Sequence, residues 1–500
     1  MTTGLSVRTL LVAKIKIFIL AVLFVSVSAG TAAEPWIDTR HPMLRTDIER
    51  LSQAGIITVP INTWPLMWGG ILNNLETYKN PILPELQDSY GRAVSAGRRA
   101  TRTGSIRLEA RLSVASESQL FRHYGGQPRD RASISLRRRN ITDHFAYNLE
   151  ITRVNHPWDG DQTHYDNSYF GFVVGNWVGL LGNIERWWGP GWNSSLTLSN
   201  NARPAPGLTL QRNYSDASEL PIIRWLGPWT TSAFIAQLDD KRHIDKAKLV
   251  GMTLGFRPGR SLEINLRRTA QWGGEGRPQG FKNFVELVTG LSDNCETSDC
   301  RQDEPGNQLA AIDVSWHMPR LNTTIYAQTV NEDESGALPS RSSRQDGLKK
   351  GISSPFFSGQ IFIEDDNTST LTFSQQYNIL YNHSIYKTGY RYQGRVVGAT
   401  WDNDSKVASL GILGLLSNGD VMEVRYSFGD INMDSINALP SQHSISTRGG
   451  EINLLTIKFR RSFLWGEAEI EGRYSTEGID EFGRQDGKLS LGATLTHRFD

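Results

Sequence analysis

The sequence predicts an all-β fold: a transmembrane antiparallel barrel of about 18 strands, preceded by a small helical unit. Three observations predict it. The first residues resemble an export signal, an alternating apolar–polar pattern continues from residue 105 onward, and the last segment carries a near-terminal aromatic residue. The mean hydropathy is −0.38, and after residue 30 no stretch is apolar enough to span a bilayer as a helix. Polytopic helical membrane proteins are therefore excluded.

Composition and charge limit the function classes. Lys and Arg total 53 against 52 Asp and Glu, a formal charge of +1 that falls to about −2 without the three basic residues of the leader. A chain with this balance does not attract phosphate backbones, so we expect no nucleic-acid partner. The 47 glycines and 14 tryptophans favour strands and turns.

Residues 1–33 read as a secretory signal peptide. Arg8, Lys14 and Lys16 form a positive n-region, residues 17–27 an apolar core, and small residues at 29–33 a cleavage site before Glu34. A signal anchor is the alternative, but the apolar run is short for a bilayer span. In an oxidising compartment Cys295 and Cys300 could close a small loop disulfide. A metal site there is less favoured, since no His or further Cys lies beside them.

Residues 34–103 predict three short helices. The first begins at Pro42 and ends at Gly55, which suits a left-handed cap. The second begins near Thr63 to Pro65, and the third runs from Pro84 through Val94. Residues 97–104 are basic and glycine-flanked, and they read as a flexible connection to the rest of the chain.

Residues 104–500 predict the barrel. One face of each candidate strand is apolar and the other polar or charged, as in residues 106–114, 145–151, 250–256, 262–267, 310–318, 422–428 and 467–474. A soluble sheet would turn the apolar face inward, whereas a membrane barrel turns it toward lipid. The export signal, about 395 residues of this pattern and the ending Leu489–Phe499 favour the barrel over a multi-domain soluble β protein. Asp500 departs from the usual aromatic terminus.

The charged faces carry runs of arginine that could line a basic lumen: Arg137 to Arg139, Arg267 with Arg268, and Arg460 with Arg461. Elsewhere positively and negatively charged side chains alternate along a strand, as in Arg107 with Glu109 and Glu471 with Arg473. We therefore expect salt bridges that hold a wet interior rigid, rather than a free basic lining.

Three segments carry a family resemblance. They are Pro35–Trp68 (PWIDTRHPMLRTDIERLSQAGIITVPINTWPLMW), Gly182–Asn213 (GNIERWWGPGWNSSLTLSNNARPAPGLTLQRN) and Glu304–Gln308 (EPGNQ) before Leu309–Asp313. Together they resemble the capsule assembly protein Wzi family. The resemblance implies an outer-membrane barrel of about 18 strands with a helical bundle on the periplasmic side. It further implies a lectin-like protein that attaches capsular or related polysaccharide to the cell surface, without catalysis or cofactor.

The residues around position 187 have the composition of a carbohydrate site. Sugars need flat apolar faces and planar polar groups that satisfy several hydroxyls or a carboxylate at once. We predict polysaccharide contacts from this segment: Glu185, Arg186, Trp187, Trp188, Trp192, Asn193, Arg203 and Arg212. A structural role is the alternative, because tryptophans at a barrel rim often belong to the interface belt and WGPG also suits a packed turn. Arg224, Trp225, Trp229, Gln271 and Trp272 have a similar composition and are weaker candidates.

Other functions are less favoured. Neither H-E-x-x-H nor G-x-S-x-G occurs, so the common zinc and serine hydrolase signatures are missing. The densest ligand-capable cluster is His156, Asp159, Asp161, His164 and Asp166, which suits an exposed loop as well as a calcium or zinc site. The main alternative to polysaccharide attachment is a porin function, and a membrane-embedded enzyme is the third hypothesis. The expected partners are polysaccharide and outer-membrane lipid, with the chain a monomer.

Overall fold

The computed structural model describes residues 35–126, 130–289, 306–335, 338–371, 374–440, 442–475 and 489–499. The predicted signal peptide at 1–33, Cys295, Cys300 and Asp500 lie outside the described residues.

Three helices form the N-terminal unit: α2 (Pro42–Gln53), α3 (Trp68–Thr77) and α4 (Pro84–Ala100). Proline occupies the first turn of α2 and of α4, as predicted. Gly55 has a φ of +74°, and the amides of Gly55 and Ile56 donate to the carbonyls of Ser52 and Leu51. This is the Schellman pattern, so the predicted end of the first helix is confirmed.

The structure corrects two details of this unit. Thr63 to Pro65 do not begin a helix, because β2 (Thr63–Trp64) and β3 (Leu66–Met67) are extended and α3 begins only at Trp68. β3 pairs with β1 (Trp36–Ile37), while β2 pairs with a distant segment described below. The first half of the predicted flexible stretch at 97–104 is helical, since α4 continues to Ala100. Arg98 and Arg99 lie in its last turn, where cations are favoured by the helix dipole.

The rest of the chain closes into one antiparallel barrel of 18 strands, which confirms the predicted fold class. The strands are β4 (Ser105–Ala115), β5 (Ala132–Ile141), β6 (Phe145–Asn155), β8 (Tyr169–Val174), β9 (Trp177–Asn183), β11 (Pro206–Arg212), β12 (Trp229–Gln237), β13 (Lys248–Phe256), β14 (Leu262–Trp272), β15 (Gly306–Met318), β16 (Thr323–Ser335), β17 (Leu338–Ser353), β18 (Phe357–Leu371), β22 (Lys406–Leu416), β23 (Val421–Ile431), β24 (Gly450–Phe463), β25 (Gly466–Ser475) and β26 (Leu489–Phe499). Two-residue strands β7 (Thr163–His164) and β19 (Gln375–Gln376) extend this sheet, and β20 (Arg391–Tyr392) pairs with β21 (Arg395–Val396) in a loop. β26 closes the barrel against β4 with Leu495 opposite Leu112.

The apolar face of the wall points outward. Leu112, Ile470 and Leu491 are 51%, 61% and 60% exposed, whereas inward residues such as Asp313 and Lys458 are buried. An outer surface of this kind is stable in hydrocarbon, and the charges then lie in the enclosed interior. The orientation that the sequence left open is thus the membrane-barrel one.

Ion pairs between and along strands neutralise many of the enclosed charges. Arg267 Nε lies 2.5 Å from Asp313 Oδ1, and Arg460 Nη2 2.5 Å from Glu469 Oε2. Glu471 binds Arg473 on its own strand at 2.9 Å and Lys458 of β24 at 2.9 Å. The prediction of salt bridges across a rigid interior is confirmed at these positions.

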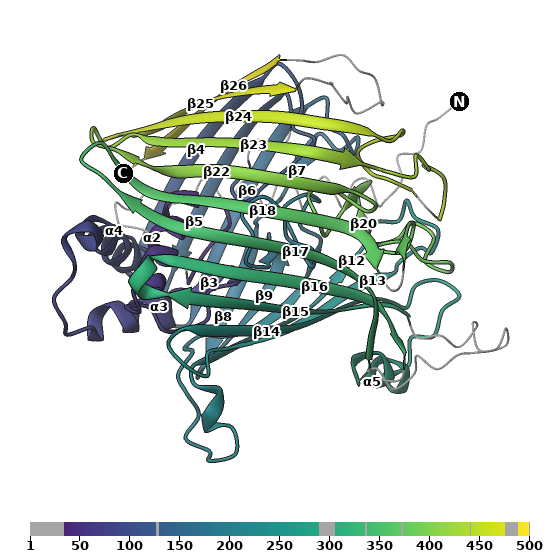
Figure 1. Ribbon diagram of the computed structural model, residues 1–500, viewed down its shortest axis with the longest axis horizontal. Helices are drawn as coiled ribbons and strands as arrows, with labels where there is room; N and C mark the ends of the chain where they lie inside the picture. The colour runs from purple at the N-terminus through teal and green to yellow at the C-terminus, as the bar shows by residue number, and fades with distance from the viewer. Residues whose placement is uncertain are drawn as a thin grey trace, which may run out of the picture.

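The two ends of the barrel differ (Figure 1). The helices α2, α3 and α4 and the C-terminus lie at one end, where most strand connections are tight turns. The opposite end carries longer loops, including α5 (Phe281–Thr289) after β14. Outer-membrane barrels have short periplasmic turns and long extracellular loops, so we call these the periplasmic and the outer end. No helix among the described residues is both long and apolar enough to cross a membrane.

Candidate functional site

Residues 184–205, between β9 and β11, leave the wall and fill the lumen; we call this segment the plug. Its strand β10 (Trp187–Trp188) pairs antiparallel with β2 of the helical unit, with Trp187 opposite Trp64 and Trp188 opposite Thr63. Trp187, Trp188 and Trp192 are each at most 1% exposed. Their rings are therefore covered by protein, and they hold the helical unit to the inside of the barrel.

Glu49 of α2 joins the plug, the helical unit and the wall. Its carboxylate accepts hydrogen bonds from Arg45 Nε at 2.9 Å, Lys349 Nζ at 2.8 Å, Trp192 Nε1 at 2.8 Å and Gln360 Nε2 at 2.9 Å. Burial alone would raise the pKa of Glu49, but the charges of Lys349 and Arg45 outweigh it and lower the pKa to about 2. The ionised carboxylate is thus the centre of a buried network.

The other predicted residues of the plug are also buried and bonded. Glu185 accepts a 2.8 Å hydrogen bond from Thr39 Oγ1, and Asn193 Nδ2 donates to Ser409 Oγ at 2.8 Å. Arg186 donates to Thr209 Oγ1 at 2.6 Å and stacks on the ring of Phe234, with Cζ 4.0 Å from the centroid. Burial lowers the pKa of Arg186 to about 9. These contacts make the plug a rigid filling of the lumen.

Arg203 lies apart from the other seven, at the outer end. Its guanidinium binds Asp159, and its Nη2 lies 3.1 Å from Asp166 Oδ1. Burial would raise the pKa of Asp159, but hydrogen bonds from His164 and Arg203 outweigh it and hold that pKa below its ordinary value. The carboxylates considered as metal ligands thus bind an arginine, and no group of three or more ligand side chains is placed to hold a metal within the described part of the chain.

A shallow cleft of about 40 Å³ surrounds Arg203; we call it the outer cleft, and its principal side chains are Trp158, His164, Arg203, Gln393 and Arg395. Trp158 is 38% exposed, and Arg395 Cζ lies 5.2 Å from the centroid of its ring. A partly exposed indole ring beside two guanidinium groups has the chemistry that sugar rings and carboxylates bind.

Three of these residues were not predicted from the sequence: Trp158, Gln393 and Arg395. The first lies in the polar loop HPWDGDQTHYDNSY, which had been considered only as a metal site. The others lie in GYRYQGR, where aromatic and arginine residues alternate within a loop. The composition of the two loops was visible in the sequence, but their contact was not.

Arg212 lies at the periplasmic end, with its Cζ 3.8 Å from the centroid of Trp229. Of the weaker candidates, Trp225 is 63% exposed at the same end, while Gln271 donates to Gly389 O at 2.6 Å and Trp272 packs on Phe284 of α5. The eight predicted residues therefore do not meet at one surface. Seven lie on the plug, of which Arg203 is at the outer end, and Arg212 lies on β11 at the periplasmic end. Their contact with polysaccharide stays a prediction.

Comparison with known proteins identifies the family of this chain. The sequence profile of a family described as capsule assembly protein Wzi matches residues 101–490. The chain belongs to the Wzi family. The solved structure of Wzi from Escherichia coli, described as an outer-membrane carbohydrate-binding β-barrel involved in group 1 capsule assembly, superimposes with a TM-score of 0.79 at 22% identity. That superposition covers 95% of this chain and 100% of the other.

A further relative comes from Klebsiella pneumoniae, an uncharacterized 55.8 kDa protein of the cps region. It is 32% identical over 306 residues, which are 59% of this chain. The chain spans only 58% of the length of that relative.

Within this Wzi-family chain, two of the segments that carried the resemblance contact each other. Pro35–Trp68 contains β2, Gly182–Asn213 contains β10, and these strands pair inside the barrel. The family profile begins at residue 101, so it covers the second segment and not the first. Trp64 and Trp68 of the first segment thus share one buried cluster with Trp187 and Trp192 of the second, which joins the helical unit to the plug.

Proposed function

We propose that this chain is an outer-membrane, lectin-like protein that binds capsular or related polysaccharide and holds it at the cell surface. One observation carries the proposal. The lumen is filled by the plug and by the helical unit, while the outer end presents Trp158 beside Arg203 and Arg395. A lumen occupied by described segments of the chain, together with a sugar-compatible outer surface, suits retention of a polymer rather than diffusion of solutes.

Three further points support it. The outward apolar face requires a bilayer. Membership of the Wzi family places the chain among capsule assembly proteins. The Escherichia coli Wzi that shares the fold is described as carbohydrate-binding, and we extend that property to this chain. Among the eight residues predicted from the sequence, we assign direct contact to Arg203 and a positioning role to the other six residues of the plug.

The outer cleft is too small to enclose a sugar ring, so binding there is a surface contact. A single contact of this kind is weak. A polymer, however, offers the same repeat many times to many copies of the protein, and each further contact then forms at high effective concentration. Retention therefore depends on the number of contacts along the polymer and needs no deep pocket.

The test uses a capsulated host from which the gene is deleted. We expect deletion to move polysaccharide from the cell-bound to the shed fraction, and the wild-type gene to restore it. Trp158→Ala is expected to restore it poorly. Trp465→Ala is the matched control, because Trp465 is similarly exposed, at 41%, but lies in the turn between β24 and β25 at the periplasmic end. Unchanged partitioning after deletion would refute the attachment function.

A porin is the second candidate, because an 18-stranded wall is wide enough for a channel. Purified protein in planar bilayers separates the two functions. The filled lumen predicts a silent barrel, whereas steady large openings would favour the porin. We propose no catalytic role, and turnover of lipid or polysaccharide substrates by the purified protein would contradict this.

A further inference from the structure

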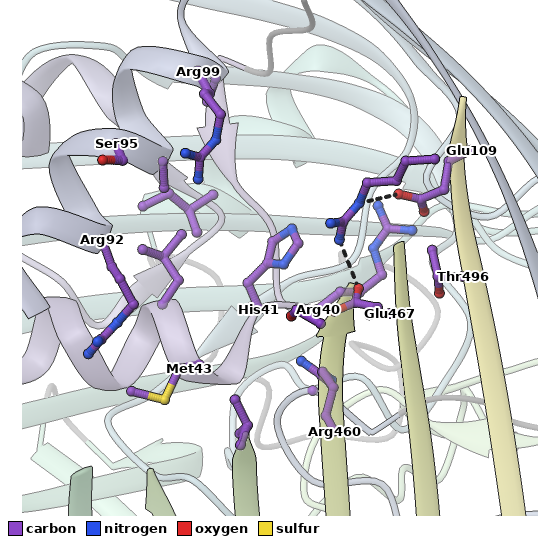
Figure 2. Close-up of a pocket in the computed structure, with 18 of the residues that line it drawn as sticks. Arg40, His41, Met43, Arg92, Ser95, Arg99, Glu109, Arg460, Glu467 and Thr496 are labelled. Carbon is purple, nitrogen blue, oxygen red and sulfur yellow. Dashed lines mark hydrogen bonds and ion pairs between the residues drawn. The ribbon is translucent and has the colours of Figure 1, made fainter. Parts of the chain in front are cut away.

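A cavity of about 670 Å³ lies at the periplasmic end, between the helical unit and the inner face of the wall. Figure 2 shows Arg92, Ser95 and Arg99 of α4 on one side, and Arg460, Glu467 and Thr496 of the barrel strands on the other. The volume lies within the range of about 300–1,000 Å³ that is typical of small-molecule sites. Neither the plug nor the outer cleft contributes to it.

The lining is strongly basic. Nine arginines line the cavity, against four carboxylates; the arginines are Arg40, Arg92, Arg99, Arg107, Arg111, Arg137, Arg139, Arg460 and Arg498. The four carboxylates already form ion pairs with these arginines. Asp47 Oδ1 lies 2.6 Å from Arg92 Nη2, Glu467 Oε1 3.0 Å from Arg498 Nη2, and Glu469 Oε2 2.5 Å from Arg460 Nη2.

Further carboxylates that do not line the cavity pair with the same arginines. Glu109 lies within 4 Å of Arg111, Arg137 and Arg498, while Asp38 and Glu150 bind Arg40 and Arg137. Among the residues that the structure describes, the cavity lining together with Asp38 and Glu150 contains nine guanidinium groups and six carboxylates. Like charges that line one concavity with low-dielectric walls raise the local concentration of anions, and guanidinium groups bind carboxylates and phosphates through paired hydrogen bonds.

The cavity is reached from the periplasmic end. Arg99 and Ser95, which lie on its rim, are both exposed. The hydroxyl groups of Ser95, Ser462, Thr494 and Thr496 add neutral hydrogen-bonding groups to the lining. A space of this size with both charged and hydroxyl groups exceeds what one phosphate ion needs and suits a short hydrophilic chain.

We propose that this cavity binds a short acidic saccharide, such as a uronate-bearing segment of a polysaccharide, from the periplasmic side. The choice of a saccharide rests on the proposed function, whereas the preference for an anion rests on the lining alone. A membrane lipid fits less well. The lipid-facing side of β4 and β26 carries Leu108, Leu112 and Leu495, while the cavity faces the inside of the barrel, so a headgroup would have to leave the leaflet.

The chain offers a matched pair of variants on one helical turn. Arg99 is exposed on the cavity rim, whereas the neighbouring Arg98 is exposed, pairs with Glu76 at 3.0 Å and does not line the cavity. Arg99→Glu and Arg98→Glu change the net charge equally. If the cavity is the site, only Arg99→Glu should weaken binding of an acidic saccharide, by about tenfold, the usual value of one charge-assisted hydrogen bond.

The measurement is calorimetric titration of the full chain in detergent with a glucuronate-bearing tetrasaccharide, its carboxyl-reduced neutral form, and inorganic pyrophosphate. Each variant is also prepared with Trp158→Ala, which removes binding at the outer cleft. We expect the acidic saccharide to bind in the Trp158→Ala background, the neutral form not to bind, and pyrophosphate to compete with the acidic saccharide. Equal losses from Arg98→Glu and Arg99→Glu, or equal binding of the acidic and neutral forms, would overturn the proposal.

A further experiment tests whether the anion bound in the cavity is a phospholipid headgroup instead of a saccharide. Nanodiscs that contain phosphatidylglycerol are compared with nanodiscs of neutral lipid, and an Arg99-dependent response to phosphatidylglycerol without saccharide binding would overturn the saccharide assignment. Failure of the two proposals is distinguishable. Loss of cavity binding with normal retention of polysaccharide on cells contradicts only the cavity, and unchanged partitioning after gene deletion contradicts only the attachment function.

Discussion

Glu49→Gln tests whether the buried network of α2, the plug and β17 holds the helical unit in the barrel. The substitution keeps the shape of the side chain but removes its charge and one of its two acceptor oxygens. In the native chain the two oxygens accept four hydrogen bonds, from Arg45, Lys349, Trp192 and Gln360. A glutamine cannot accept all four.

The structure allows the magnitude to be estimated. Removing one partner of a buried ion pair typically costs about 3–5 kcal/mol. Lys349 and Arg45 keep their hydrogen bonds to Pro190 O, at 2.9 and 2.8 Å, and the amide of Gln360 can rotate. We therefore expect the lower end, about 3 kcal/mol, which raises the population of the undocked helical unit by about a hundredfold.

Limited trypsin digestion of the full chain in detergent measures that population. Arg45 and Arg50 are fully buried on α2, so cleavage after them requires undocking. When reclosing is fast, the cleavage rate follows the open population. We expect Glu49→Gln to be cut there about a hundred times faster than wild type.

Glu76→Gln is the matched control, because Glu76 forms a surface pair with Arg98, and exposed pairs contribute roughly 0–1 kcal/mol. Equal cleavage rates for the two variants would refute the assigned role of Glu49.

Four further outcomes are expected. The pKa of Glu49 is lowered from 4.5 to about 2, so its ionised form stabilises docking fully above about pH 4.5 and loses that effect as the pH falls toward 2. The protection factors of the α2 amides, which are the exchange rates corrected for the intrinsic rate at each pH, should therefore fall in this window in wild type, and a pH-independent difference between wild type and Glu49→Gln would contradict the assignment. Trp192→Ala removes a fully buried ring and should destabilise the barrel by about 3–5 kcal/mol, seen as a lower midpoint of heat-modifiable migration, whereas Trp158→Ala should leave that midpoint unchanged. Arg203→Gln leaves Asp159 and Asp166 without their cation, so proteolysis of the loop at 156–168 should increase while cleavage of α2 does not; no change in the loop would argue against the ion pairs. Glu49→Gln is expected to add conductance steps to the silent barrel in planar bilayers, and a silent variant would show that the plug closes the lumen without the helical unit.

Much of the wall could be predicted from the sequence. In Leu489–Phe499 every second residue except His497 is apolar, and the structure has this segment as β26 with Leu489, Leu491 and Leu495 exposed to the outside. The pattern is local, because successive residues of a strand point to opposite faces. The caps at Pro42 and Gly55 were equally predictable, since they depend only on the allowed backbone angles of those residues.

The candidate site was less predictable because its contacts are distant in sequence. Trp187, Trp188 and Trp192 have the composition of a sugar site, yet the structure surrounds them with protein. Trp192 donates to Glu49, which is 143 residues away. The prediction of a helix from Thr63 failed for a similar reason, since β2 forms its hydrogen bonds with β10. No local pattern signals such pairing.

By itself, the sequence determined that the chain forms two-faced strands and approximately how many of them there are, and it predicts an export signal at residues 1–33. These properties follow from side-chain alternation and composition, which are local to each segment and do not depend on its contacts with other segments. Only the tertiary structure decided what fills the lumen, which arginines lie at which end, and that Trp158 meets Arg395 at the outer surface. The reason is physical: burial and charge pairing depend on which distant segments come together, and an indole ring in the sequence has the same chemistry whether protein or water covers it.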